Sequence, residues 1–154
     1  YDDYTQAIRG VLDNFDTLYP QYKEQGYEVA GFVWWQGHKD QSAALASRYE
    51  QNLVHLIKSL RKDFNSPNAK FVLATGCGNP GRESFGLQIA DAQLAVDGDK
   101  GKYPEFKGNV ATVYSNPLSM GGSGNGHYGG NAETYMNVGE AMGKAMVELL
   151  KNPK

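Results

Sequence analysis

Two polar segments of this sequence carry the side chains best suited to chemistry. "QGHKD" contains His38 and Asp40, and "SNPLSMGGSGNGHYGG" contains His127. A histidine within hydrogen-bond reach of a hydroxyl can take its proton and turn a poor nucleophile into an active one. The same three side chains also form a two-histidine, one-carboxylate set of the kind that can hold a metal. Such sets often arise by chance, so we expect no metal at these residues.

Candidates for a nucleophile inside these segments are weak. Cys77 lies in "GCGNPGRES" with no histidine beside it in the sequence, so we expect an incidental or buried thiol. Ser119 and Ser123 occupy neither a G-x-S-x-G elbow nor a strand-to-helix turn. The residues alone therefore do not name the group that would attack a substrate.

The surrounding elements predict where these segments lie. Short, apolar, β-prone runs at residues 29–35, 70–75 and 109–114 predict strands covered on both faces. They alternate with predicted helices over residues 4–15, 42–62, 85–96 and 131–150, of which the second is capped by either Asp40 or Ser42. This order predicts parallel βαβ units in one domain over residues 1–154, a three-layer α/β/α sandwich with a small sheet. Ligands bind beyond the carboxyl ends of such strands, where both polar segments lie.

Apolar spacing also predicts which helix faces are buried. Gly139 and Gly143 are expected to let the last helix pack closely on the sheet, and Trp34 and Trp35 should point to opposite faces of their strand. The predicted stripes are Tyr4, Ala7, Ile8, Val11, Leu12 and Phe15 in the first helix, Leu45, Tyr49, Leu53, Leu56 and Leu60 in the second, and Tyr135, Val138, Met142, Ala145 and Leu149 in the last.

Composition excludes several classes of function. The net charge of −2 is spread without basic runs, which argues against nucleic-acid binding and against a polybasic membrane contact. No apolar run approaches the roughly 20 residues that span a bilayer. The glycine-rich segments match neither phosphate-binding pattern, so we expect no nucleotide or other cofactor. The single cysteine excludes an internal disulfide.

Three blocks resemble a known family. "FVWWQGHKD" resembles the W-x-Q-G-E-S-D block of the sialate O-acetylesterase-like esterases, which are related to carbohydrate esterase family six within the SGNH/GDSL hydrolases. "DAQLAV" is similar to the R-x-A-Q helix of that group, and "GHYGGNAETYMNVGEAMGKAM" stands where its last block has a histidine before the final helix. The resemblance implies a flavodoxin-like SGNH hydrolase fold and a serine esterase that removes acyl groups, often acetyl, from carbohydrate or another small ester.

The resemblance also implies roles for particular residues. His127 would be the base, Gln36 an oxyanion donor, and Asp40 the carboxylate that orients a histidine. The residues expected to contact substrate are Gly37, His38 and Asn125.

This sequence departs from the family pattern in three places. Gly124 stands three residues before His127 where the family often has an acid, and His38 replaces the family's glutamate. The N-terminal block that carries the nucleophilic serine has no match, and the predicted fold opens on a helix rather than a strand. Two explanations stay open: the chain is the C-terminal part of a longer esterase, or it is a complete short protein that builds its site from other residues.

Further expectations follow from these departures. Without a leading strand, residues 29–35 would lie at a sheet edge, so we expect a homodimer or a partner chain that completes the sheet. A catalytically silent α/β domain that binds carbohydrate or a protein is the alternative to an esterase. The compartment is open, although the resemblance favours a secreted or periplasmic protein.

Overall fold

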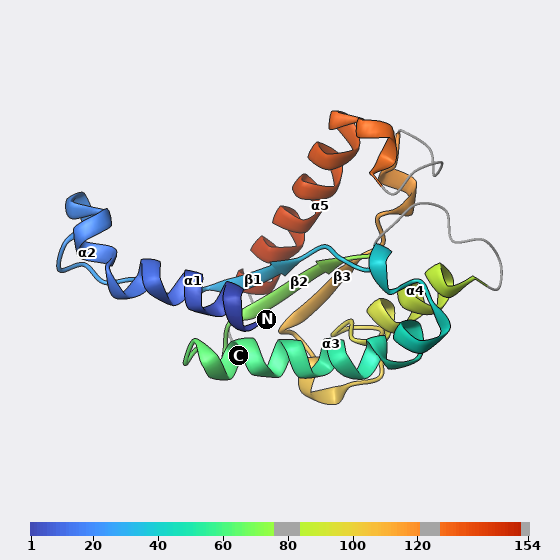
Figure 1. Ribbon diagram of the computed structural model, residues 1–154, viewed down its shortest axis with the longest axis horizontal. Helices are drawn as coiled ribbons and strands as arrows, with labels where there is room; N and C mark the ends of the chain where they lie inside the picture. Colours follow the sequence, from blue (N-terminus) through green and yellow to red (C-terminus); the bar gives the residue numbers. More distant parts are fainter. Residues whose placement is uncertain (76–83, 121–126, 152–154) are drawn as a thin grey trace.

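Three short apolar strands form a parallel sheet in the part of the chain that the computed structural model describes, residues 1–75, 84–120 and 127–151 (Figure 1). The strands are β1 (Gly31–Trp34), β2 (Lys70–Ala74) and β3 (Val110–Val113), in the order β1-β2-β3. Phe71 of β2 is the register partner of Phe32 in β1 and of Val110 in β3. All residues of β2 are buried, as the continuous apolar run predicts.

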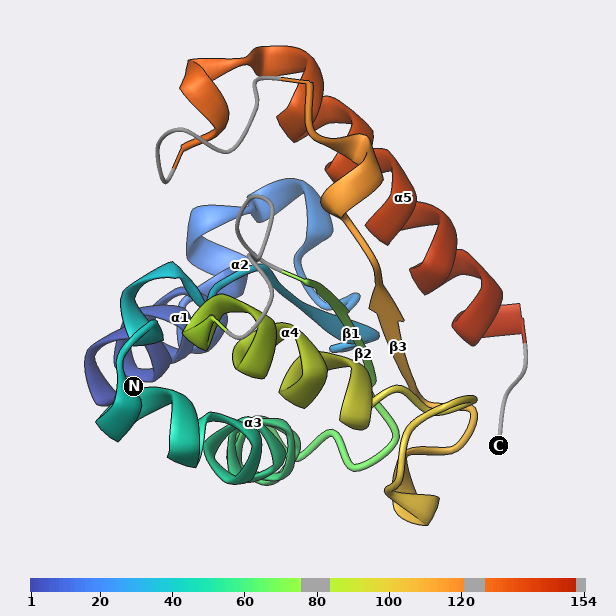
Figure 2. The same cartoon turned by 90° about the vertical axis from the view of Figure 1, so that its right-hand side faces the viewer.

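Helices cover both faces of the sheet, which confirms the three-layer α/β/α prediction (Figure 2). α3 (Ala43–Asp63) and α4 (Phe85–Ala95) pack on one face, and α5 (Ala132–Lys151) packs on the other. A hydrophobic core lies on each face of the sheet, and the side chains of β2 enter the two cores alternately, because successive side chains of a strand point to opposite faces. Phe71 and Leu73 face α3 and α4, whereas Val72 and Ala74 face α5.

The two tryptophans divide between these cores as predicted. Trp34 packs against the core under α3 and α4, and Trp35 packs against the core under α5. Short 3₁₀ turns connect the main elements; their bounds are Pro20–Tyr22, His38–Asp40, Pro104–Phe106, Asn116–Leu118 and Tyr128–Gly130.

The predicted apolar stripe of the first helix is not buried. The segment forms α1 (Asp2–Asp13) and the short α2 (Phe15–Leu18), and the buried residue of α1 is Thr5. Tyr4 is 79% exposed, because α1 turns a different side toward the end of α3. Arg9 makes that contact by donating to the carbonyl oxygen of Asp63 at 2.9 Å. The periodicity therefore predicted a helix correctly, but the apolar face that it marks is not buried.

The predicted faces of α3 and α5 pack on the core except at the first residue of each stripe. Leu45 is 48% exposed, because α3 buries the row Ala46, Tyr49, Leu53 and Ile57. Tyr135 is 40% exposed at the start of α5, whereas Val138 and Met142 are buried as expected. A Cβ atom built on Gly139 or Gly143 would meet nothing within 4 Å, so neither glycine is needed for close packing. Within the described residues, no helix has the length and apolar character needed to cross a membrane.

Replacing Gly139 with alanine tests this corrected packing. Gly139→Ala should raise the free energy of unfolding by about 0.5–1 kcal/mol, because glycine in an open helix position costs that much relative to alanine. Gly98→Ala is the contrasting variant, since its Cβ would lie 2.4 Å from the carbonyl oxygen of Phe106, and it should destabilise the fold. Urea unfolding followed by tryptophan fluorescence measures both. A destabilised Gly139→Ala would show that α5 does pack closely at this position.

Candidate functional site

Two loops meet at the carboxyl end of the sheet. After β1 the chain passes through Gln36 and Gly37 into the 3₁₀ turn His38–Asp40, and His127 precedes the turn that leads into α5. Residues from both loops line one pocket of about 220 Å³. The pocket thus brings together side chains that lie far apart in the sequence. Its lining residues are Trp35, Gln36, Gly37, His38, Lys39, His127, Tyr128 and Tyr135.

An aromatic cluster holds the two loops against each other. Trp35 stacks on Tyr128 with ring centroids 5.5 Å apart, and Tyr135 contacts Trp35 edge-on at the same distance. Tyr128 and Tyr135 also meet edge-on, at 5.9 Å. Aromatic pairs in these geometries each contribute about 0.5–1.5 kcal/mol beyond the area they bury. The Tyr135 hydroxyl donates to the carbonyl oxygen of His127 at 3.2 Å, which ties the histidine backbone to α5.

The beginning of α5 is fixed by its own cap. The side chain of Asn131 accepts a hydrogen bond from the backbone N–H of Thr134 at 2.8 Å. Thr134 is fully buried, and its hydroxyl accepts from the backbone N–H of Met120 at 2.8 Å. Gly129 and Gly130 have φ angles of 65° and 72°, which glycine adopts without strain. These features place His127 one short turn before a well-anchored helix.

Gly37 lets the first loop pass close beneath α4. It is buried and has a φ of 152°, a backbone conformation that favours glycine. A Cβ atom here would lie 2.9 Å from Cγ2 of Ile89 and 3.4 Å from Nε2 of Gln93. The glycine predicted to contact substrate therefore also makes the close packing of this loop possible.

Asp40 contacts Gln36, which differs from its predicted role. Its carboxylate accepts a hydrogen bond from Nε2 of Gln36 at 2.6 Å. Among the described residues Asp40 thus orients the glutamine rather than a histidine. Both residues also line a second pocket of about 200 Å³, together with Trp34, Tyr49, Asn52, Leu53 and Leu56. Gln36 is common to the two pockets.

The remaining predicted residues fall into two groups. His38 is exposed and lines the first pocket, whereas Asn125, Cys77 and Ser123 lie outside the described residues. The hydroxyl of Ser119 is shielded from solvent and has no hydrogen-bond partner in the described part of the chain, and it lines neither pocket. In that same part, no three His, Cys, Asp or Glu side chains lie close enough to hold a metal, so the set of His38, Asp40 and His127 is not assembled.

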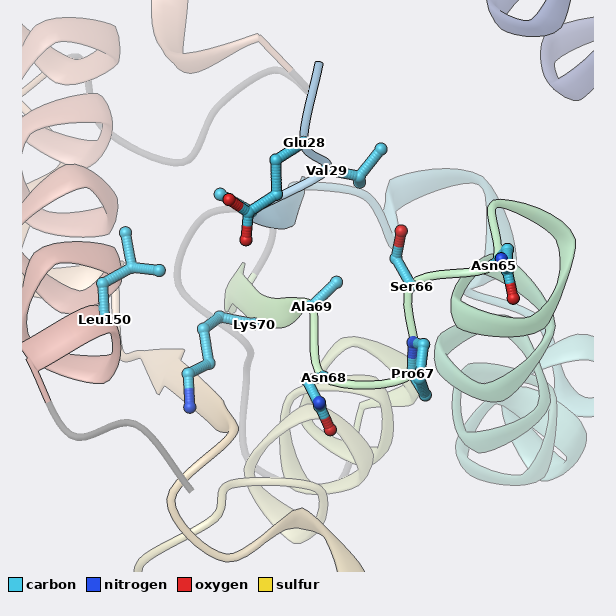
Figure 3. Close-up of a pocket in the computed structure, with 10 residues that line it drawn as sticks. Glu28, Val29, Asn65, Ser66, Pro67, Asn68, Ala69, Lys70 and Leu150 are labelled. Carbon is cyan, nitrogen blue, oxygen red and sulfur yellow. The ribbon is translucent and has the colours of Figure 1, made fainter. Parts of the chain in front are cut away.

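A further hollow of about 480 Å³ lies at the opposite, amino end of the strands (Figure 3). Glu28, Lys70 and Leu150 line it, among others. Lys70 is buried, and its ammonium group donates to the carbonyl oxygen of Gly108 at 3.2 Å. No histidine is among the described residues that line this hollow, so the pocket at the carboxyl ends of the strands remains the candidate site.

Sequence reasoning missed the residues that hold the site together. The sequence indicates Tyr49 only as part of an apolar stripe and Gln93 only as part of the block that resembles the R-x-A-Q helix, yet both hydrogen-bond to Gln36. Tyr135 was expected in the core, and it lines the pocket. Gln93 lies four residues after Ile89 and three before Val96, on the predicted apolar face of its helix, and that position could have pointed to it because buried amides require partners.

Comparisons with known proteins identify the family and the fold. The family model described as carbohydrate esterase, sialic acid-specific acetylesterase, matches residues 7–148. No curated protein matches the chain. An X-ray structure of an Arabidopsis thaliana protein is similar, with a TM-score of 0.56 and 20% sequence identity. The alignment covers 96% of this chain and 53% of that one, so this chain spans about half the length of the solved structure, and the likeness shows the fold alone.

Gly37→Ala should disrupt the first loop. The new Cβ would collide with Ile89 in a backbone conformation that alanine rarely adopts, and the expected loss in the free energy of unfolding is about 1–3 kcal/mol. Urea unfolding with fluorescence detection measures the loss. Gly10→Ala is the matched control, because a Cβ there meets nothing within 4 Å. Equal stabilities of the two variants would contradict the packing described.

Proposed function

We propose that this chain, which belongs to the carbohydrate esterase family of sialic acid-specific acetylesterases, carries the base and the oxyanion donor of an ester-hydrolysing site. The observation that supports the proposal is that Gln36 and His127 line a single pocket at the carboxyl ends of the strands. These two residues occupy the positions that the family motifs predict for an oxyanion donor and a base.

The chemistry follows from the two side chains. The His127 imidazole takes the proton of the attacking hydroxyl, the group that the labelling experiment below identifies, as that oxygen attacks the acyl carbon, and the carbonyl electron pair moves onto the carbonyl oxygen. The Gln36 amide N–H donates to this oxyanion, a contact worth on the order of 3 kcal/mol in the transition state. When the carbonyl re-forms, the alcohol leaves with the proton from the imidazolium. Water then repeats the sequence on the acyl-enzyme and releases the acid.

The size and lining of the pocket favour a substrate with a small acyl group on a carbohydrate or a similar alcohol. Its volume of about 220 Å³ lies below the roughly 300–1,000 Å³ of sites for drug-sized ligands, which suits a group such as acetyl. Trp35, Tyr128 and Tyr135 provide apolar ring surface with polar edges, which matches the apolar faces and hydroxyl rims of sugar rings.

Hydrolysis of p-nitrophenyl acetate tests the proposal. His127→Ala should lower kcat/KM by about 10²–10⁴-fold, because general base catalysis contributes that factor. The release of p-nitrophenol at neutral pH is the measurement. His55→Ala is the matched control, since His55 is exposed on α3 and lines neither pocket, and it should retain wild-type activity.

A serine-directed fluorophosphonate identifies the nucleophile by mass mapping of the labelled peptide. Labelling should weaken in His127→Ala and persist in His55→Ala. A wild-type rate no higher than that of His127→Ala, together with no labelling, would rule out an esterase and favour a silent carbohydrate- or protein-binding domain.

We also propose that the chain associates through the free edge of β1. β1 is an edge strand in the described sheet, and Val33 is 58% exposed. Light scattering coupled to size exclusion should give the mass of a dimer. Val33→Lys should lower that mass toward a monomer, because edge lysines oppose strand pairing. A monomeric wild-type chain across micromolar concentrations would contradict this proposal.

A further inference from the structure

Four side chains form a continuous hydrogen-bonded chain behind the candidate pocket. Gln93, fully buried in α4, donates from Nε2 to the Gln36 carbonyl oxygen at 2.7 Å and to the Tyr49 hydroxyl at 3.1 Å. The Tyr49 hydroxyl lies 2.8 Å from the Gln36 carbonyl oxygen and 3.3 Å from its side-chain Oε1. Nε2 of Gln36 donates to Asp40 at 2.6 Å. These hydrogen bonds therefore connect Gln93 in α4, through Tyr49 in α3 and Gln36, to Asp40 in the turn before α3.

The groups at the two ends of these hydrogen bonds determine which atoms donate and which accept. Nε2 of Gln93 can only donate, so the Tyr49 hydroxyl oxygen accepts from it. The hydroxyl hydrogen of Tyr49 is therefore directed to the oxygens of Gln36, its backbone carbonyl and Oε1. At the other end a carboxylate only accepts. Rotating the Gln36 amide by 180° would place its oxygen against the Asp40 carboxylate, where neither oxygen has a hydrogen to donate, and would remove the acceptor Oε1 from the Tyr49 hydroxyl. The repulsion at Asp40 therefore favours a single amide orientation.

We infer that Asp40 and Tyr49 are positioning residues that lock the Gln36 amide with Nε2 toward the carboxylate. This inference rests on the proposed function, in which the same amide serves as the oxyanion donor. One hydrogen of Nε2 is used by Asp40, and no described residue accepts the other. That second hydrogen is the one available to a developing oxyanion. The predicted catalytic carboxylate thus acts on the amide instead of the base.

The Asp40 bond also holds the donor firmly in place. A hydrogen bond from an amide N–H to a carboxylate is roughly twice as strong as a neutral one. Because the amide is held before substrate arrives, no reorganisation is needed as charge develops, which is the condition for effective oxyanion stabilisation.

NMR of the ¹⁵N-labelled full chain tests the fixed orientation of the Gln36 amide and does not require the chain to be active. The Gln36 side-chain NH₂ pair, assigned by its loss in Gln36→Ala, should show two well-separated hydrogens, with the one facing Asp40 shifted downfield. Asp40→Asn should remove that downfield shift, because asparagine can donate to Gln36 Oε1 and allow the rotated amide. Tyr49→Phe should broaden the pair, since Oε1 loses its donor while the ring is kept.

Asn52→Ala is the matched control. Asn52 lines the same second pocket, and no hydrogen bond joins it to Gln36. This variant should leave the NH₂ pair unchanged. An NH₂ pair that is insensitive to both Asp40→Asn and Tyr49→Phe would overturn the inference.

A double-mutant cycle in ester hydrolysis separates positioning from general structural loss. Asp40→Asn should lower kcat about 10–10²-fold with little change in KM, and it should have no further effect in a Gln36→Ala background. Equal effects in both backgrounds would show that Asp40 acts independently of Gln36 and would also overturn the inference. A chain that hydrolyses no ester but shows the expected NMR changes would remove the proposed function and leave the lock in place.

Discussion

The hydrogen bond from the buried amide of Gln93 to the carbonyl oxygen of Gln36 is the contact on which the candidate site depends. It fastens the first loop to α4 at the point where β1 ends. Gly37 makes the contact possible, because any Cβ at that position would push against Ile89. Buried amides left without partners cost about 1–3 kcal/mol, so the loop and the helix stabilise each other. The position of Gln36 is thus set by a helix that follows it by some fifty residues in the chain.

The opposite wall of the pocket is built by different forces. Trp35, Tyr128 and Tyr135 pack by ring contacts, and the hydrogen bond from Tyr135 to the His127 carbonyl connects that cluster to α5. The site therefore combines a polar wall, where donors and acceptors impose direction, with an aromatic wall that supplies apolar area. A polar wall suits the stabilisation of charge, and an aromatic wall suits recognition of a neutral alcohol.

The two sides of the sheet are covered unequally. α3 and α4 protect one face, while α5 packs against β2 and β3 and leaves Val33 of β1 exposed. The exposed stripe of α1, which includes Tyr4 and Ile8, adds apolar surface near the N-terminus. Exposed apolar surface combined with a free strand edge is typical of surfaces that meet another polypeptide. The polar wall, by contrast, is held by hydrogen bonds among Gln93, Tyr49, Gln36 and Asp40 of the described chain.

Local patterns in the sequence determined the elements and their order. Apolar runs and helical spacing predicted all three strands and the helices α3, α4 and α5 to within a few residues, because backbone periodicity depends on neighbours in the chain. The same reasoning placed His38, Asp40 and His127 beyond the carboxyl ends of the strands, since parallel topology brings those ends to one edge of the sheet. The family motifs added Gln36 and its expected role.

Tertiary structure alone decided which side chains meet. The spacing could not show that Asp40 bonds Gln36, that Tyr49 and Gln93 support the same amide, or that the stripe of α1 stays exposed. Each of these depends on the rotation of a helix about its axis and on the approach of distant backbone. Those quantities are set by the packing of the whole core, and no local pattern of residues encodes them.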